Sequence, residues 1–582
     1  MTNKPLHFPI EAVATYPLPG TAVPGSVRFS PDGRKVSYLH SADSSLTRQL
    51  YQFDLETGEH SLLIDAGGGN TDENVSLEEA LRRERMRQRE FGITQYTWHK
   101  TDKILVPLQG GIAILDKPGG TLRHLLLPAD APTIDPRFSP DGSWVAYVQN
   151  DELHIIPTAG GSPQQLTFGA AESGKTHGLA EYIAQEEFAR RRGYWWSPDN
   201  QQIAFAEVDE THIPVYRIVH QGKDTVGDGA QEDHRYPFAG MPNAKVRLGL
   251  ISVNGGDPSW LDLSDNDDFY LARVQWAAND KLLVQILNRE QSQLDLLLFN
   301  PQTGEKRVLL TETSNVWINV HDMCRPFPAT PNLPDGGFIW ASERSGFQHL
   351  YLVDWDGVVI RPLTQGSWLI TGIAGVDTET DIIYFTATKA GPDETHLYAV
   401  SLMGGDIRRI TQVDGTHAAT SNQDKKLFID THHNRETPPT IVVRSLETGE
   451  VVQNVFEGEN GRSADPLLTA PEIVTFNSRD GVPLYGALYR PPAAFGKGPF
   501  PTIVSVYGGP HAQRVTNSWL LTVDMRAQYL SSLGFLVFKL DNRGSARRGL
   551  AFESALKHNM GDIEVQDQVD GVNWLASQGL TD

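Results

Sequence analysis

Two adjacent glutamates, Glu186 and Glu187, are the first residues of this sequence whose types and spacing suggest chemistry. They occur in AEYIAQEEFARRRGYWWSPD, just upstream of an aromatic, strand-like segment. Neighbouring carboxylates repel each other and are costly to remove from water. The pair therefore suggests a function that needs both negative charges. The structural alternative is a pair of ion pairs with Arg190 and Arg191 one helical turn on, each worth roughly 0.2–0.5 kcal/mol.

A second candidate is Tyr507, which lies in VYGGPHAQ. The glycine pair and the proline follow an apolar strand and allow the backbone to turn sharply beside a site. A tyrosine directly before such a turn could donate a hydrogen bond to a developing oxyanion. The alternative is an ordinary strand-ending turn with a packed tyrosine, and the residues alone leave both open.

The segment SLEEALRRERMRQREFG predicts a polar helix over residues 76–90. Ser76 and Glu79 match a capping box, which is typical of a helix start. Five arginines and four glutamates follow, which leaves little apolar stripe for docking. From periodicity alone, this pattern favours a solvated helix held by ion pairs.

The elements that must position these residues repeat along the chain. An aromatic-Ser-Pro-Asp motif recurs at Phe29, Phe138 and Trp196, each time followed by an apolar strand. Eight hairpins with glycine-containing turns accompany it, mostly about 40–60 residues apart, which is the length of one four-stranded propeller blade. One gap, from Leu153 to Leu250, is nearly twice as long and contains the glutamate pair, so that blade is expected to carry an insertion.

These repeats predict an eight-bladed β-propeller over residues 26–465, after an N-terminal segment 1–25. The propeller would include the arginine-rich helix (76–90) and a helix that carries the glutamate pair (180–191). Residues 466–582 change to buried apolar strands and a closing helix, which predicts the first, incomplete part of an α/β-hydrolase domain. A set of β-sandwiches is the alternative to the propeller.

Composition narrows the class of protein and its surroundings. The net charge of −22 argues against nucleic acid or an anionic membrane as a partner. The single cysteine, Cys324, excludes internal disulfides, fits a reducing compartment and is expected to be a buried structural thiol. No apolar run long enough for a membrane span or a secretory signal is present, so a cytoplasmic protein is expected, or a periplasmic one if a signal has been removed.

Taken together, the propeller repeats, QEEF before GYWWSPD, VYGGP and DNRGS resemble the dipeptidyl peptidase IV family, serine peptidases of the prolyl oligopeptidase clan. The resemblance runs through essentially the whole chain. RRERMRQREFGI and WINVHD look closest to the bacterial and cytosolic branch. The resemblance to this family implies that the protein releases N-terminal Xaa-Pro or Xaa-Ala dipeptides from peptides with a free N-terminus.

The resemblance also implies roles for particular residues. Glu186 and Glu187 match the family's glutamates that bind the α-amine of the substrate. An arginine of the R-E-R-x-R pattern, namely Arg83, Arg85 or Arg87, would reach the substrate carbonyl, and Arg85 is preferred. Tyr507 matches the tyrosine that helps to stabilise the oxyanion.

The catalytic triad of such a peptidase does not occur in this sequence. Gly-x-Ser-x-Gly, the nucleophile elbow that would precede the Asp and the His, is found nowhere in the 582 residues. The expectation is therefore a fragment of an active peptidase that hydrolyses nothing by itself. An oligopeptidase or acylaminoacyl peptidase of the same clan, and a peptide-binding propeller without catalysis, are the alternatives.

No cofactor and no metal site are expected. His432 and His433, in DTHHNRE, lack partners at ligand spacing and are predicted to lie in a solvated loop. For the full-length protein, the resemblance allows a homodimer.

Overall fold

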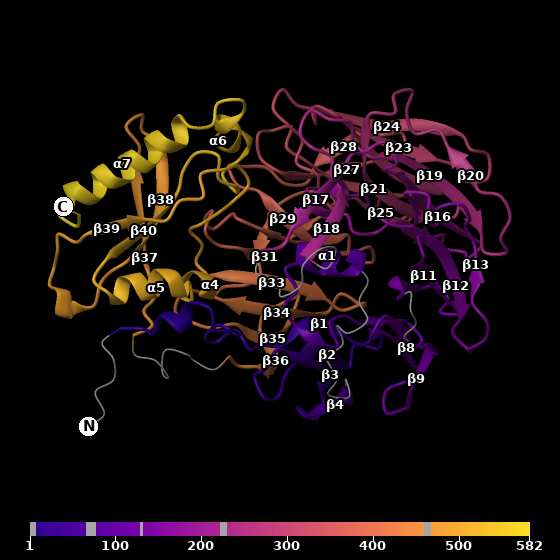
Figure 1. The fold of residues 1–582 in the computed structure, drawn as a ribbon, viewed down its shortest axis with the longest axis horizontal. Helices are drawn as coiled ribbons and strands as arrows, with labels where there is room; N and C mark the ends of the chain where they lie inside the picture. Colours follow the sequence, from indigo (N-terminus) through magenta and orange to yellow (C-terminus); the bar gives the residue numbers. More distant parts are fainter. Residues whose placement is uncertain (1–6, 66–76, 128–131, 222–229, 459–466, 582) are drawn as a thin grey trace. The chain divides into compact units, whose positions relative to one another are not determined.

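The computed structural model describes residues 7–65, 77–127, 132–221, 230–458 and 467–581 (Figure 1). Two compact units make up the chain. Unit 1 consists of Met1–Leu62 and Met323–Asp582, and unit 2 consists of Leu63–Asp322. The predicted domain boundary at 465–466 and the predicted helix start at Ser76 lie outside the described residues.

The described part of unit 2 contains four antiparallel sheets in which the strands follow one another as a meander. The first contains β6 (Thr97–Trp98), β7 (Ile104–Leu108), β8 (Gly111–Leu115) and β9 (Leu122–Leu126). The second contains β10 (Ile134–Phe138), β11 (Trp144–Gln149), β12 (Glu152–Pro157) and β13 (Gln164–Gln165). The third contains β14 (Lys175–His177), β16 (Gln202–Asp209), β19 (Lys245–Ser252) and β20 (Ser259–Leu261), with β15 (Tyr194–Trp196) also paired to β16. The fourth contains β21 (Phe269–Ala278), β22 (Lys281–Asn288), β23 (Gln293–Phe299) and β24 (Lys306–Thr313).

Unit 1 contributes four more sheets with the same order of strands. The first contains β1 (Gly25–Phe29), β2 (Lys35–His40), β3 (Thr47–Asp54) and β4 (His60–Ile64), whose last two residues belong to unit 2. The second contains β25 (Arg325–Phe327), β26 (Gly337–Ser342), β27 (His349–Val353) and β28 (Val359–Pro362). The third contains β29 (Ile370–Asp377), β30 (Ile382–Ala387), β31 (His396–Ser401) and β32 (Arg408–Arg409). The fourth contains β33 (Thr416–Ser421), β34 (Leu427–His433), β35 (Thr440–Ser445) and β36 (Val451–Phe456).

The repeated Ser-Pro-Asp motif forms a turn between consecutive strands. In each copy the serine hydroxyl donates a hydrogen bond of 2.6 Å to the aspartate two residues on, at Ser30, Ser139 and Ser197. The same hydroxyl accepts the backbone N–H at or next to the start of the following strand, from Lys35, Trp144 and Gln202. The motif therefore starts the hairpin locally, while apolar side chains between neighbouring sheets form the core.

Insertions interrupt the third sheet of unit 2. Helix α2 (Tyr182–Glu186) lies between β14 and β15, and a hairpin of β17 (Val215–Val219) and β18 (Gln231–Arg235) lies between β16 and β19. Both fall in the long gap of the hairpin repeat, where an insertion is predicted. Helix α1 (Leu77–Arg85) and the short strand β5 (Phe91–Gly92) precede the first sheet of unit 2.

The C-terminal part of unit 1 is a mixed sheet with helices on both faces (Figure 1). Its strands are β37 (Glu472–Asn477), β38 (Pro483–Tyr489), β40 (Leu536–Asp541) and β39 (Thr502–Val504), in this order, with β39 parallel to β40. Phe538 of β40 packs against α7 (Ile563–Ser577) on one face of the sheet. The preceding residue, Val537, packs against α5 (Met525–Ser532) on the other face. The shorter helices are η1 (Ile10–Val13), η3 (Ala493–Phe495), α4 (Trp519–Thr522), α6 (Leu550–Glu553) and η4 (Ser554–Leu556).

Candidate amine-binding site

A cavity of about 570 Å³ lies within unit 2, between α1, α2 and the β17–β18 hairpin. Three of the predicted site residues, Arg85, Arg87 and Glu186, line it together. Arg83 and Glu187 are not among its lining residues. We call this cavity, with Glu186 in its wall, the candidate amine site.

Helix α2 presents the glutamates because it is short and has one buried face. Ala184 and Gln185 are buried, and Phe188 packs edge-on against Tyr270, with ring centroids 5.3 Å apart. Glu186 and Glu187 fall on the exposed side of this turn. The observed helix is shorter than the predicted range 180–191, since Ala189 adopts a left-handed φ of 53° that ends the helical geometry.

The arginine after the helix holds α2 in place instead of neutralising the glutamate pair. Arg190 is 5% exposed, and its Nη2 donates to the Glu181 carboxylate at 2.6 Å. Its other nitrogens donate to the backbone carbonyls of Leu271 (2.9 Å) and Arg192 (2.8 Å). Within the described ranges, no ion pair joins Glu186 or Glu187 to an arginine, so the alternative of pairing one helical turn on is not realised.

Arg85, one of the three predicted arginines, contacts α2 directly. Its Nη1 donates to Oε1 of Gln185 at 2.9 Å, and its guanidinium carbon lies 5.0 Å from the centroid of the Tyr182 ring. Arg87 lines the cavity from the turn after α1, where its φ is 55°. The observed α1 ends at Arg85, which is earlier than the predicted end at residue 90.

Tyr182 links the charged end of the cavity to its aromatic wall. Burial raises the pKa of the Tyr182 hydroxyl to about 12, with smaller contributions from the neighbouring Tyr236 and from the negative charge of Glu186. This tyrosine therefore stays neutral at physiological pH and can act as a hydrogen-bond donor near Glu186.

A close approach of two backbones fixes the segment after α2. A Cβ atom on Gly193 would lie 2.3 Å from the carbonyl carbon of Gly178, which no side chain can tolerate. The N–H of Ala206 donates to the Gly193 carbonyl at 2.8 Å, and the N–H of Gly178 donates to the Ala206 carbonyl at 2.8 Å. Glycine at position 193 therefore ties the segment that carries the glutamates to the sheet.

Tyr507 lies in unit 1, three residues beyond the end of β39. Its side chain is 60% exposed, so it is not the packed tyrosine of the alternative interpretation. The turn that follows needs Gly508, whose φ of 84° is in the left-handed region. The side chain of Tyr507 is thus accessible to solvent.

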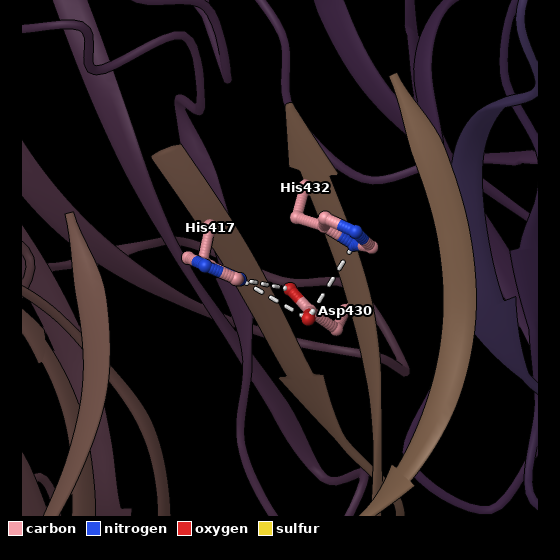
Figure 2. A group of neighbouring side chains, drawn as sticks. All are labelled: His417, Asp430 and His432. Carbon is pink, nitrogen blue, oxygen red and sulfur yellow. Dashed lines mark hydrogen bonds and ion pairs between the residues drawn. The ribbon is translucent and has the colours of Figure 1, made fainter. Parts of the chain in front are cut away.

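A cluster of histidines and an aspartate lies in unit 1, away from these residues along the chain (Figure 2). Nδ1 of His417 lies 2.8 Å from Oδ1 of Asp430, and Nδ1 of His432 lies 3.6 Å from Oδ2. Arg444 donates to the same Oδ2 at 2.8 Å, and Nε2 of His417 is hydrogen-bonded to the Val413 carbonyl at 2.8 Å.

This cluster is an ion-pair network around Asp430. Burial acts to raise the pKa of the Asp430 carboxyl, but the hydrogen bond from His417 and the charges of His417, His432 and Arg444 lower it overall. A divalent cation would have to displace the Arg444 guanidinium, so we assign no metal here. The prediction of a solvated loop for His432 and His433 is wrong, because both belong to β34, where cross-strand pairing partly buries them.

Sequence reasoning missed three contributors to the candidate amine site. Glu181 offered no signal, because only the fold brings it to Arg190. For Tyr216 and Ile218, which line the cavity, the sequence did offer a signal. Residues alternate in VYRIV as they do in a strand, and a second strand-like segment follows. Cys324 was interpreted correctly, since it is a free, buried thiol, and burial raises its pKa to about 12.

Comparison with known proteins places this geometry in context. Residues 98–439 match the family described as "Dipeptidyl peptidase IV (DPP IV) N-terminal region", and residues 521–582 match the "Prolyl oligopeptidase family". Dipeptidyl peptidase 8 of Homo sapiens is 30% identical over 597 residues, which cover 86% of this chain and 66% of the relative. Dipeptidyl-aminopeptidase B of Aspergillus niger is 26% identical, over 76% of this chain and 52% of the relative. The crystal structure of Porphyromonas gingivalis dipeptidyl peptidase 4 matches with a TM-score of 0.79 and 22% identity, over 97% of this chain and 78% of that chain.

The fold is a β-propeller region followed by part of a prolyl oligopeptidase-type hydrolase domain, which confirms the predicted fold class. The chain belongs to the dipeptidyl peptidase IV family. It spans 66% of the length of the human relative and about half of the fungal one, at 52%. Among the described helices, none combines the length and the apolar character that crossing a bilayer requires.

Proposed function

We propose that these residues form the substrate-binding part of a serine-type dipeptidyl peptidase. The enzyme would release Xaa-Pro or Xaa-Ala dipeptides from peptides with a free N-terminus. One observation carries the proposal: Glu186 is exposed in a cavity and has no ion-pair partner among the described residues. A carboxylate placed in this way is available to a cationic ligand.

The α-amine of a peptide is such a ligand. Its pKa is near 8, so it is mostly protonated at neutral pH and forms charge-assisted hydrogen bonds with carboxylates. Glu186 would take the ammonium, with Glu187 beside it. Arg85, held by Gln185 at 2.9 Å, would donate to the carbonyl of the first substrate residue. In this proposal, Arg83 and Arg87 do not contact that carbonyl.

The chemical step would use Tyr507 and residues outside this sequence. Tyr507 would donate a hydrogen bond to the oxyanion of the tetrahedral intermediate. The 582 residues contain no Gly-x-Ser-x-Gly elbow, so the proposal requires that the nucleophile, the base and its aspartate come from elsewhere. On this proposal the 582-residue chain binds peptides without cleaving them.

Isothermal titration calorimetry with the 582-residue chain tests the amine anchor. Gly-Pro-amide should bind, and its N-acetylated form should not. Glu186→Gln should weaken binding of the free amine by about ten- to a hundredfold, since it removes a charge-assisted hydrogen bond. Glu305→Gln, an exposed position outside the cavity, is the matched control and should change nothing. Equal binding of both peptide forms would refute the anchor.

Two other functions would use the same cavity differently. An oligopeptidase or acylaminoacyl peptidase has no need of a free amine, so it would accept the acetylated peptide. A peptide-binding propeller without catalysis would show the amine dependence but no turnover in the natural protein that contains these residues. Cleavage of Gly-Pro-p-nitroanilide by that natural protein, but not of its N-acetylated form, supports the dipeptidyl peptidase.

We also propose a cytoplasmic location and a homodimer of the full-length protein. The location is supported by the free, buried thiol of Cys324, which suits a reducing compartment. The homodimer is supported by α7, whose valines at 565, 569 and 572 form an exposed apolar stripe. Sedimentation velocity of the natural protein measures its mass directly, and a monomer at micromolar concentration would contradict the dimer.

A further inference from the structure

Three arginines come from three sheets of unit 2 that pack against one another, outside the candidate amine site. Arg137 belongs to β10 of the second sheet, and Arg273 belongs to β21 of the fourth. Arg192 lies two residues before β15 of the third sheet, which packs between the other two. None of the three arginines lines the cavity that contains Glu186.

Two of these arginines already have a carboxylate partner. Arg137 donates to both oxygens of Asp135, from Nε at 3.0 Å and from Nη2 at 2.6 Å. Arg82 of α1 approaches the same carboxylate at 3.4 Å. Nε of Arg273 donates to the Asp322 carboxylate at 2.5 Å. Each of the two aspartates is therefore committed to an arginine other than Arg192.

Arg192 differs from its neighbours because its side chain has no such partner. Among the residues that the structure describes, none forms a hydrogen bond or an ion pair with its guanidinium, which is exposed. The surrounding protein still removes part of its hydration, and this desolvation, followed by the positive charge of Arg137, lowers the pKa of Arg192. Asp135 and Asp322 act in the opposite direction, so Arg192 lies within electrostatic reach of both flanking pairs.

The backbone that carries Arg192 is held in place on both sides. Nη1 of Arg190 donates to the Arg192 carbonyl at 2.8 Å, and the carbonyl of the next residue, Gly193, accepts an N–H of β16 at 2.8 Å. The hydroxyl of Tyr194 donates to the backbone carbonyl of Asp135 at 2.5 Å, which ties the start of β15 to β10. A side chain on a fixed backbone loses less freedom when it binds a ligand.

This local excess of positive charge is opposite in sign to the charge of the whole chain, which is −22. One carboxylate serves Arg82 and Arg137 together, and the other serves Arg273. The N–H donors of Arg192 and the remaining positive charge are thus available to an anion.

We propose that Arg192 binds a small oxyanion, with the two flanking arginine–aspartate pairs beside it. The ligand class is a carboxylate or a phosphate group, because a guanidinium forms two parallel hydrogen bonds with either. The ligand has the opposite charge to the ammonium proposed for Glu186. This inference therefore does not depend on the proposed function.

Isothermal titration calorimetry of the 582-residue chain tests the site with inorganic phosphate and, separately, with succinate. Sodium chloride keeps the ionic strength equal in all titrations, since screening weakens exposed charges. At least one of the two anions should bind. Arg192→Ala should weaken this binding by about ten- to a hundredfold, because it removes charge-assisted hydrogen bonds.

Two further variants separate direct contact from general charge. Arg307→Ala is the matched control, since it removes the same charge from an exposed position on β24 and should leave anion binding unchanged. Arg192→Lys keeps the charge but cannot form two parallel hydrogen bonds, so it should recover only part of the affinity.

Thermal unfolding provides a second readout on the same proteins. The bound anion should raise the midpoint of the unaltered chain as its concentration rises, and Arg192→Ala should lose this rise. Without the anion, both proteins should unfold at the same temperature, because Arg192 is exposed and makes no contact that its loss would break.

Each outcome decides the proposal. Binding of phosphate alone would support the site and assign it to phosphate groups, and binding of succinate alone would assign it to carboxylates. Binding of neither anion would overturn the site. Unchanged binding in Arg192→Ala would place the anion at another cationic group, such as Arg87 of the candidate amine site, and an equal loss in Arg307→Ala would show an effect of net charge only; either result would also overturn it.

Discussion

Glu181 and Glu186 lie five residues apart, yet the folded chain gives them opposite surroundings. Glu181 is 6% exposed and ion-paired to Arg190 at 2.6 Å, whereas Glu186 is exposed in the cavity. A buried carboxylate needs its partner to offset desolvation, and an exposed one does not. Of the two carboxylates, Glu186 is therefore the one with no ion-pair partner among the residues that the structure describes.

His433 is a single residue whose protonation should affect stability. Burial, followed by the nearby His417 and His432, lowers the pKa of His433 from 6.5 to about 4. In its neutral form, Nδ1 accepts the backbone N–H of Trp519 at 3.1 Å. Because the folded state binds the proton more weakly than the unfolded state, the stabilisation should be lost as the pH falls from about 6.5 towards 4.

Urea unfolding at pH 7 and pH 5 measures this loss. His433→Gln cannot titrate in this range, so its free energy of unfolding should fall less between the two pH values than that of the unaltered chain. His124→Gln replaces an exposed histidine and should behave like the unaltered chain. An identical pH dependence in all three proteins would contradict the role of His433.

The His417–Asp430–His432 cluster leads to a prediction about metals. Since Arg444 occupies Oδ2 of Asp430 at 2.8 Å, added Zn²⁺ should not stabilise the folded chain. Thermal unfolding with Zn²⁺ in excess and with EDTA should give the same midpoint. A rise in the midpoint with Zn²⁺ that Asp430→Asn abolishes would show that the network does accept a metal.

At the scale of elements, α2 is a very short helix that depends on its surroundings. Its residues Tyr182–Glu186 make barely more than one turn, and isolated helices of this length are not stable in water. Arg190 and Gly193 supply what the helix lacks, the first through side-chain hydrogen bonds and the second through backbone contact. The position of Glu186 is thus set by residues that do not line the cavity.

Arg190→Ala should therefore affect both stability and binding. Removal of one partner of a buried ion pair costs about 3–5 kcal/mol, because Glu181 is left buried and unpaired. The free energy of unfolding should fall by this amount in urea denaturation, and the affinity for Gly-Pro-amide should fall as well.

Two comparisons distinguish positioning from general destabilisation. Arg190→Lys, which keeps the charge, should recover part of the amine affinity. Arg289→Ala removes a more exposed pair with Asp268 in the same unit and should cost less than about 1 kcal/mol without changing affinity. If Arg190→Ala bound the peptide as tightly as the unaltered chain, Arg190 would not position Glu186.

At the scale of the molecule, unit 1 brings together segments from both ends of the chain. Trp519 is fully buried, and its indole N–H donates to the Pro19 carbonyl at 2.9 Å. Phe8 packs in the same cluster, and its backbone N–H donates to the hydroxyl of Ser532 at 3.2 Å. The N-terminal segment is therefore part of the core beside α4 and α5.

Trp519→Ala should destabilise the protein by about 3–5 kcal/mol through the cavity that it leaves. Leu520→Ala is the matched control, because Leu520 is the next residue and is 62% exposed. Its effect should stay within about 0.5 kcal/mol. Thermal and urea unfolding measure both, and a Trp519→Ala variant as stable as Leu520→Ala would show that the N-terminal segment does not depend on this side chain.

Much of the fold could be predicted because its signals are local. The Ser-Pro-Asp turn closes within two residues, and strand alternation is visible in each segment by itself. The same holds for the change to buried apolar strands after the propeller repeats. Errors arose where local patterns compete, as with the adjacent histidines at 432 and 433, whose polar neighbours suggested a loop.

By itself the sequence determined the family of the fold, the repeated turns and the residue types available at the candidate amine site. Only the tertiary structure decided which of them act together. Arg85 donates a hydrogen bond to Gln185, which lies 100 positions further along the chain. Ring contacts connect Tyr216 through Phe238 and Tyr236 to Tyr182 of α2. Such contacts depend on strand register and on the turns between sheets, which bring distant residues together, whereas periodicity reports only on neighbours in the chain.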